Sequence, residues 1–252
     1  IIESTRVRVA ALQPKATALR AAAAVAPAAR SLSAALRTDG LSVIAEIKRR
    51  SPSAGDIAPD IDAVEQARRY VEGGAAAISV LTEPDYFGGS LDDLRAVRAA
   101  AAVPVLRKDF IVDALQVWEA RAAGADAVLL IVAALDSDEL VHLLEVVADA
   151  GLEALVEAHT SSEVEVAVAS GATIVGVNNR DLGTFVTDLA VGEQIAPSLP
   201  DSVVAVGESG VSSVDGARRM ARAGYDAILV GEAAVRSPDP AGFISQLREV
   251  GG

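Results

Sequence analysis

Apolar residues along the chain form short runs that are rich in β-branched side chains, separated by longer stretches with helical spacing. Four of these runs begin just after Gly74, Gly124, Gly171 and Gly224, which are spaced by 50, 47 and 53 residues. Glycine commonly closes a helix in the left-handed conformation. A run that is apolar at consecutive positions suits a strand buried on both faces. The repeat therefore predicts helix-then-strand units.

Further strand candidates lie between these units. They are Val43–Ile47, Val103–Arg107, Leu152–Glu157 and Val203–Gly207, and together with the four runs they make eight predicted strands. Patterns with helical spacing fill the gaps, and several of them begin with Asp or Ser as an N-cap and end at glycine. Strands that alternate with helices indicate an α/β protein with a parallel sheet.

Two α/β architectures fit this order, a (β/α)8 barrel and a doubly wound sheet. We favour a single (β/α)8 TIM barrel because the chain of 252 residues has the usual length and no G-x-G-x-x-G follows the first strand. We expect residues 1–40 to form an N-terminal helical extension that caps one barrel end, and residues 41–252 to form the barrel.

Charge and composition restrict the possible partners. Acidic residues outnumber basic ones by 35 to 22, for a net charge of −13, so we expect no nucleic-acid partner. An anionic ligand would need a local positive site. The longest uncharged run, 166–179, is too short to span a bilayer. The absence of cysteine excludes disulfides and cysteine-bound zinc and fits a reducing compartment. We therefore expect a cytoplasmic monomer without membrane contact.

Charged residues cluster where the predicted strands end, which is where barrel enzymes carry their chemistry. Glu46 and Lys48 are two residues apart and therefore point to the same side of the first strand. Lys108 follows the third strand. The chain has 19 arginines and only three lysines, so two of its three lysines lie at strand ends. Lysine can give up a proton that arginine retains, and burial can lower a lysine pKa toward ~7–8.

The later strand ends add carboxylates, amides and glycines. Glu157 ends the fifth strand, with His159 two residues beyond it as a weaker candidate base. Asn178 ends the sixth strand, and its neighbour Asn179 is either a functional group or a turn former. Glycine-bearing loops after the last two strands are the usual phosphate site of barrel enzymes. The candidates in these later loops are Arg180, Glu208, Ser209, Gly210, Gly231 and Glu232.

The chain has two histidines and no cysteine, so a metal centre built on either residue type is not expected. Acid–base chemistry without a cofactor, on a phosphorylated small molecule, is the class of function that these residues favour.

Seven motifs between residues 41 and 236 carry a family resemblance: "IAEIKRRSPSAG", "ISVLTEPDYFGGSLDDL", "PVLRKDFIVDALQVWEARAAGADAVLLIVAAL", "LVEAH", "GVNNRDLGTF", "VGESGV" and "ILVGEAAV". Together, and in this order, they resemble the motifs of the indole-3-glycerol-phosphate synthase family. The resemblance implies a single barrel with a helical N-terminal extension. It also implies a lyase of tryptophan biosynthesis that closes the pyrrole ring of 1-(2-carboxyphenylamino)-1-deoxyribulose 5-phosphate. Carbon dioxide and water are lost, and no metal or organic cofactor takes part.

The resemblance also implies a role for each motif residue. Lys108 would be the general acid at the ribulose carbonyl oxygen, and Glu157 would move protons in the dehydration. Glu46 and Lys48 would position the ring and its carboxylate. Asn178, Glu208 and Ser209 would orient the substrate hydroxyls and the catalytic groups, with support from Arg180. The phosphate would be held by Ser51, Gly210, Gly231 and the amide of Glu232, and the aromatic ring by Phe87 and Phe110.

Three features depart from the family pattern. Gly207 precedes the Glu-Ser-Gly motif where Ala or Ser is usual, "VDALQVWEA" replaces a Pro-Tyr-Gln pattern, and the N-terminal extension is short. Two alternative functions stay open at this point. The chain could be another phosphate-binding barrel enzyme, such as a sugar-phosphate isomerase, or a scaffold that binds without catalysis.

Overall fold

Eight parallel strands form a closed barrel in the computed structural model, which describes residues 1–181 and 183–251. The predicted TIM barrel is therefore confirmed. Each strand pairs with its neighbours in the order β1-β10-β9-β8-β7-β6-β5-β4. The barrel strands are β1 (Ser42–Ile47), β4 (Ala77–Leu81), β5 (Val105–Lys108), β6 (Ala127–Ile131), β7 (Glu153–Ala158), β8 (Ile174–Asn178), β9 (Val204–Glu208) and β10 (Ala227–Val230).

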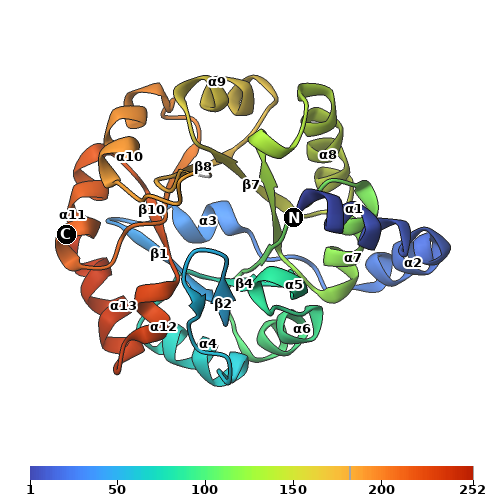
Figure 1. Ribbon diagram of the computed structural model, residues 1–252, viewed down its shortest axis with the longest axis horizontal. Coiled ribbons are helices and arrows are strands. Elements are labelled where there is room, and N and C mark those ends of the chain that lie inside the picture. Colours follow the sequence, from blue (N-terminus) through green and yellow to red (C-terminus); the bar gives the residue numbers. More distant parts are fainter. Residues whose placement is uncertain (182, 252) are drawn as a thin grey trace.

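Helices surround this barrel on the outside (Figure 1). The helices are α4 (Ala63–Glu72), α5 (Pro84–Phe87), α6 (Leu91–Ala100), α7 (Ala114–Ala123), α8 (Ser137–Asp149), α9 (Ser161–Ala169), α10 (Leu189–Ile195), α11 (Val214–Ala223), α12 (Glu232–Arg236) and α13 (Pro240–Arg248), with short 3₁₀ turns η2 (Val132–Ala134), η3 (Ala196–Ser198) and η4 (Glu249–Gly251). Eight of these ten helices begin at Asp, Ser or Thr residues whose side chains accept hydrogen bonds from the first turn, as at Asp62, Asp113 and Ser213. The other two, α5 and α12, begin at Glu83 and Gly231.

The repeating glycines end the helices as the pattern predicted. Gly124 and Gly224 are the C-caps of α7 and α11, with φ of 91° and 99°. Gly74 and Gly171 follow α4 and α9 and also have positive φ. In this left-handed conformation a Cβ would be strained, so glycine is favoured at these positions.

Several strand boundaries differ from the prediction by one or two residues; β1 begins at Ser42, for example, and β7 spans Glu153–Ala158. The third and seventh predicted strands were expected to end at Arg107 and Gly207, but Lys108 and Glu208 still belong to β5 and β9. Lys108 pairs with Leu81 of β4, and Glu208 pairs with Asn178 of β8. The polar side chains are therefore held by strand backbone. The loop after β1 also contains an unpredicted two-residue ladder of β2 (Arg50–Ser51) and β3 (Gly55–Asp56).

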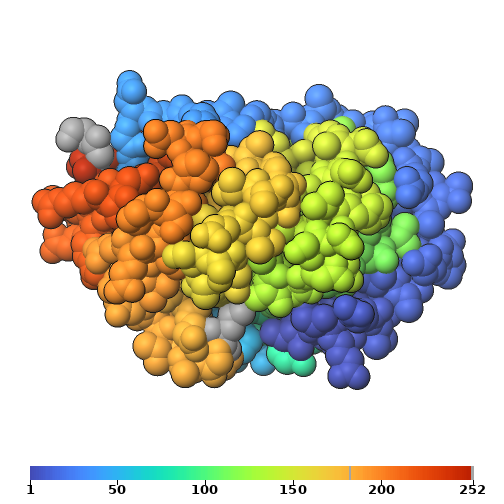
Figure 2. Space-filling view, turned by 90° about the horizontal axis from the view of Figure 1, so that it is seen from above, coloured from blue at the N-terminus to red at the C-terminus, as the bar shows by residue number. Residues whose placement is uncertain are grey.

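The segment before β1 contains α1 (Ile2–Ala10), η1 (Gln13–Lys15), α2 (Ala16–Val25) and α3 (Leu32–Leu36). Figure 2 shows its dark-blue first residues at one end of the barrel and the lighter blue residues that lead into β1 at the other end. Leu32 and Leu36 of α3 are completely buried against the apolar residues inside the barrel. The side chain of Glu153, at the start of β7, accepts hydrogen bonds from Ser33 of α3. Glu153 is therefore a structural residue at this closed end.

None of the helices in the described part of the chain is long and apolar enough to cross a membrane.

A second apolar core lies between the barrel and its helices, and fully buried Tyr70 belongs to it.

Candidate active site

A pocket of about 660 Å³ opens at the carboxyl ends of the barrel strands. Its lining is drawn from the loops and strand ends of the whole barrel and from the first residues of the chain. Fourteen of the candidates named from the sequence lie on it: Glu46, Lys48, Ser51, Phe87, Lys108, Phe110, Glu157, Asn178, Arg180, Glu208, Ser209, Gly210, Gly231 and Glu232. The other two, His159 and Asn179, line a smaller cavity beside it.

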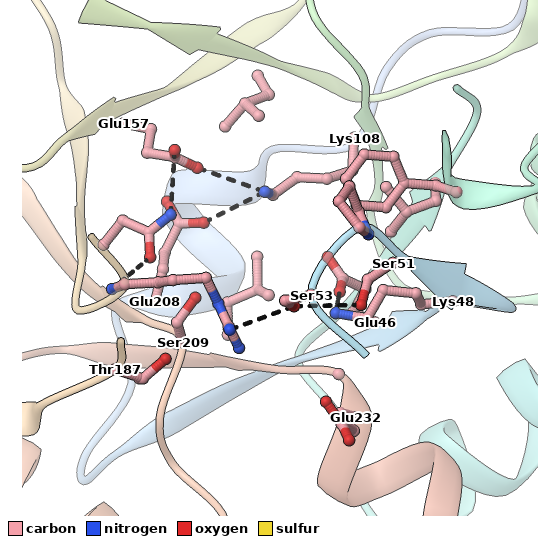
Figure 3. A pocket seen from close by; sticks show the side chains of 18 of the residues that line it. Glu46, Lys48, Ser51, Ser53, Lys108, Glu157, Thr187, Glu208, Ser209 and Glu232 are labelled. Atoms are coloured by element: carbon pink, nitrogen blue, oxygen red, sulfur yellow. Dashed lines mark hydrogen bonds and ion pairs between the residues drawn. The ribbon is translucent and has the colours of Figure 1, made fainter. Parts of the chain in front are cut away.

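Four charged side chains form the uppermost layer of the barrel interior (Figure 3). In a (β/α)8 barrel, the inward side chains of alternate strands meet in one layer. Glu46, Lys108, Glu157 and Glu208 come from β1, β5, β7 and β9, the alternate strands of this barrel. Lys108 Nζ lies 3.3 Å from Glu157 Oε2 and 3.6 Å from Glu208 Oε2. A layer that is usually apolar therefore carries three carboxylates and one ammonium group.

The three carboxylates determine the protonation of Lys108. Burial by itself would lower the pKa of this lysine, but the charges of Glu157, Glu208 and Glu46 outweigh burial and raise the pKa above its ordinary value. The expectation that burial would lower this pKa toward neutrality is therefore wrong for Lys108. The lysine is a stably protonated acid, not a base.

The two glutamates beside Lys108 differ from each other. Burial and the neighbouring charge of Glu157 raise the pKa of Glu208 to about 8. Burial would also raise the pKa of Glu157, but Lys108, His159 and a hydrogen bond from Asn178 lower it overall. One carboxyl is therefore mostly protonated at neutral pH and the other ionised, which separates a proton donor from a proton acceptor.

Glu208 is accommodated by a glycine on the neighbouring strand. A Cβ on Gly176 of β8 would collide with the Glu208 carboxylate. No hydrogen-bond partner for Glu208 Oε1 is present among the described residues. An unpartnered buried carboxyl oxygen next to a pocket can bind a substrate hydroxyl.

Glu46 and Lys48 form a second ion pair, with 3.0 Å between Lys48 Nζ and Glu46 Oε1. The side chains emerge on the same side of the strand end, as their spacing of two predicts, although Lys48 lies just beyond β1. The pair packs against Gly231, because a Cβ there would be 2.5 Å from Glu46 Oε1 and 3.3 Å from Lys48 Nζ. The absence of a side chain at Gly231 therefore gives this pair its space.

The asparagines after β8 have different surroundings. Asn178 Nδ2 donates a hydrogen bond to Glu157 Oε1 at 3.1 Å, so this amide orients the carboxylate. Asn179 is almost completely buried, and its Nδ2 donates to the backbone oxygens of Glu208 and Ser209. Asn179 is therefore structural, and it fixes the end of β9. Arg180 lies at the pocket mouth, where Nη1 donates to Ser53 Oγ in the loop after β1.

The loops after β9 and β10 carry the predicted glycines. Ser209 and Gly210 have φ of 61° and 86°, so the backbone turns sharply away from β9. A side chain on Gly210 would lie 2.8 Å from Thr187 Cγ2. Glu232 begins α12, and its carboxylate accepts a hydrogen bond from Arg236 Nε at 3.1 Å. Arg236 thereby offsets the charge that would repel a phosphate.

One wall of the pocket is apolar. The rings of Phe87 and Phe110 have their centroids 6.3 Å apart at an angle of 40°. Phe87 ends the short helix α5, whose first amides donate to the buried carboxylate of Glu83. Phe110 follows Asp109, whose carboxylate accepts a hydrogen bond from the Phe110 amide at 2.9 Å. Both rings are therefore held by buried carboxylates in the adjacent loops.

Sequence reasoning missed several lining residues. Ile1 and Ile2 of the N-terminal segment, Phe185, Thr187 and Arg236 all line the pocket. Phe185 and Thr187 follow the asparagine motif, so their position in a strand-end loop was a usable signal. The contribution of Ile1 and Ile2 depends on how α1 packs, for which the local sequence has no signal.

Fold and site together define a TIM-barrel enzyme. A layer of acidic and basic side chains lies beneath a pocket large enough for a small-molecule substrate. A family model described as "Indole-3-glycerol phosphate synthase" matches residues 1–247. The chain belongs to the indole-3-glycerol phosphate synthase family.

Curated relatives agree with this assignment. The chain is 49% identical to an indole-3-glycerol phosphate synthase of Mycobacterium ulcerans, over all of this chain and 93% of the relative. It is 54% identical to one from a Nocardioides species, over 92% of this chain and 89% of that protein. Among solved structures, the 3-hexulose-6-phosphate synthase of Salmonella typhimurium superposes with a TM-score of 0.68 at 17% identity, covering 83% of this chain and 98% of that one. That similarity supports the barrel fold only.

Proposed function

We propose that this chain converts 1-(2-carboxyphenylamino)-1-deoxyribulose 5-phosphate to indole-3-glycerol phosphate, with loss of carbon dioxide and water. Membership of the family supports the reaction. The observation that carries the proposal is the position of Lys108 between Glu157 and Glu208 at the base of the pocket. An acid, an ionised carboxylate and a protonated carboxyl lie within reach of one bound molecule, as a reaction with several proton transfers requires.

Lys108 acts as the general acid in this proposal. The ring closure places negative charge on the ribulose carbonyl oxygen, and a protonated lysine nearby neutralises it by donating a proton. The raised pKa supports this role, because Lys108 enters each turnover protonated. Glu157, which is ionised, then accepts and returns protons during the dehydration. Asn178, Glu208 and Ser209 orient the substrate hydroxyls and the catalytic groups.

The ion pair of Glu46 and Lys48 positions the anthranilate end of the substrate, with Lys48 facing the carboxylate that is lost. The rings of Phe87 and Phe110 form the wall for the aromatic ring, and their tilted packing at 6.3 Å supports this assignment. Arg180 supports the loop network at the pocket mouth.

The phosphate binds at the other end of the pocket. Ser51, Gly210, Gly231 and the backbone amide of Glu232 are the proposed ligands. The ion pair between Glu232 and Arg236 supports this, because the Glu232 carboxylate is paired with the Arg236 guanidinium. The backbone amide of Glu232 is then the polar group left for the phosphate.

We further propose that residues 41–252 are the catalytic barrel, with residues 1–40 as its extension, and that the protein works as a monomer in the cytoplasm.

The test is incubation with the carboxyphenylamino ribulose phosphate in metal-free buffer while indole fluorescence is recorded. Formation of indole-3-glycerol phosphate is expected. If no product forms although the substrate binds, the proposed reaction is wrong and the chain is a binding scaffold.

A further inference from the structure

His159 lies just behind the catalytic layer, in the loop after β7. Its Nε2 is 3.4 Å from Glu157 Oε1, and its Nδ1 is 3.4 Å from Glu163 Oε2. Both ring nitrogens are buried, and neither has a hydrogen-bond partner among the described residues. An imidazole with two open nitrogens between two carboxylates has the geometry of a proton shuttle.

A second cavity, of about 280 Å³, is lined by His159 but not by Glu157 or Lys108. Glu163 of α9 and Asp181 of the β8–α10 loop line this cavity together with His159. The Glu163 side chain is 24% exposed, whereas that of Glu157 is 4% exposed. The row of side chains therefore runs from solvent at Glu163, through His159, to the buried Glu157 and on to Lys108.

The proposed reaction needs such a supply of protons. The bond between the ring and the carboxylate breaks, and carbon dioxide leaves as a neutral molecule that takes no proton. The hydroxyl leaves as water and therefore needs one. With the substrate carboxylate ionised at the start, charge balance requires one proton from solvent in each turnover. A substrate that fills the main pocket covers the direct path from solvent to the catalytic layer.

We propose that His159 relays this proton from the second cavity to Glu157, which in turn reprotonates Lys108. The imidazole accepts a proton at Nδ1 from the side of Glu163 and releases one at Nε2 to Glu157 Oε1. Asp181 and Arg180 are the other charged residues that line the second cavity. This inference rests on the proposed function. His159 acts through Glu157, so it is a positioning and relay residue and does not itself contact the substrate.

The test compares His159→Gln with the wild-type protein. Glutamine fills similar space and can donate a hydrogen bond toward Glu157 but cannot carry a proton, so a merely structural role would survive the change. We expect kcat to fall about tenfold while KM changes by less than about twofold. Free imidazole in the buffer should restore the kcat of His159→Ala, since a small base can enter the vacated space. Glu163→Gln should also lower kcat.

The matched control is His142→Gln, because His142 is the other histidine of the chain and lies exposed on α8. Its kcat should equal that of the wild-type protein. A His159→Gln protein that is folded by circular dichroism, keeps wild-type kcat and shows no buffer dependence would overturn the relay. If His159→Gln does not fold, the same kcat comparison is made with His159→Asn. A wild-type protein that makes no product would overturn the proposed function itself, and the relay with it.

Discussion

Gly231 and Glu46 lie so close that the glycine cannot carry a side chain without moving the glutamate. An added Cβ would be 2.5 Å from Glu46 Oε1, well inside van der Waals contact. Because Glu46 is almost fully buried and paired with Lys48, it has little room to retreat. The end of β10 therefore determines the position of an ion pair on β1.

Gly231→Ala should accordingly displace the Glu46–Lys48 pair and lower kcat/KM by about ten- to a hundredfold, which corresponds to about 1–3 kcal/mol of overpacking. Steady-state kinetics with the carboxyphenylamino ribulose phosphate measure this. Gly171→Ala is the control, since its φ is 92° but nothing lies within 4 Å of the added Cβ. That change should lower thermal stability and leave kcat/KM intact. Unchanged kinetics for Gly231→Ala would show that the pair tolerates the shift.

Lys108→Met should abolish turnover while the barrel stays folded. The thioether has nearly the same length as the lysine stem but no proton to give, so we expect a loss of at least about 10²-fold in kcat. Lys15→Met is the control, because Lys15 lies exposed in η1. Stopped-flow indole fluorescence measures the rate, and far-ultraviolet circular dichroism checks the fold. Near-wild-type turnover by Lys108→Met would remove this lysine as the acid.

Much of the fold could be predicted because a barrel repeats one local pattern. The spacing of Gly74, Gly124, Gly171 and Gly224 marks four helix ends, and the apolar runs after them are strands buried on both faces. The site followed from the same pattern, since charged residues at strand ends must meet at one end of a closed barrel. Glu46 and Lys108 were recognisable for this reason.

What the sequence could not predict depends on contacts between distant segments. The raised pKa of Lys108 reflects carboxylates from three other strands, whereas the sequence showed only that the lysine would be buried. The positions of Ile1 and Ile2 in the pocket wall depend on α1 docking against the loop after β4. The pairing of Glu232 with Arg236 is a local i, i+4 contact and could have been predicted from spacing.

The raised pKa of Glu208 predicts how stability varies with pH. In an unfolded chain this carboxyl has its ordinary pKa of 4.5, whereas in the folded protein its pKa is raised to about 8. Between these values the folded state binds more protons than the unfolded state, so the contribution of Glu208 to the free energy of unfolding falls as the pH rises. The lowered pKa of Glu157 and the raised pKa of Lys108 contribute nearly constant terms in this window.

Glu208→Gln should remove this part of the pH dependence, since the amide cannot ionise. Relative to wild type, the variant should gain about 1–3 kcal/mol of stability between pH 5.5 and pH 8. Urea unfolding at both pH values measures the difference. The control is Glu193→Gln. Glu193 is at the surface, and a hydrogen bond from Arg219 lowers its pKa, so the stability difference between this variant and wild type should not vary between pH 5.5 and pH 8. A constant difference for Glu208→Gln would contradict the raised pKa.

Arg8 fastens the N-terminal helix to the wall of the pocket. Its Nη1 lies 2.6 Å from Glu83 Oε1 and 2.9 Å from Asp85 Oδ2. Glu83 is completely buried and also accepts hydrogen bonds from the first amides of α5, the helix that ends at Phe87. One guanidinium group therefore couples α1, which brings Ile1 and Ile2 to the pocket, to the loop that carries an aromatic wall residue.

Arg8→Met should leave the Glu83 carboxylate buried without its cation, which costs about 1–3 kcal/mol of stability for a partly exposed pair. The pocket wall should loosen, so KM for the carboxyphenylamino ribulose phosphate should rise about three- to tenfold, while kcat changes little because the catalytic layer is untouched. Arg6→Met is the matched control, since Arg6 is exposed on the same helix. Thermal unfolding and steady-state kinetics test both variants. If Arg8→Met lowers kcat and leaves KM unchanged, α1 acts on the chemistry and not on substrate binding, which would contradict this role of Arg8.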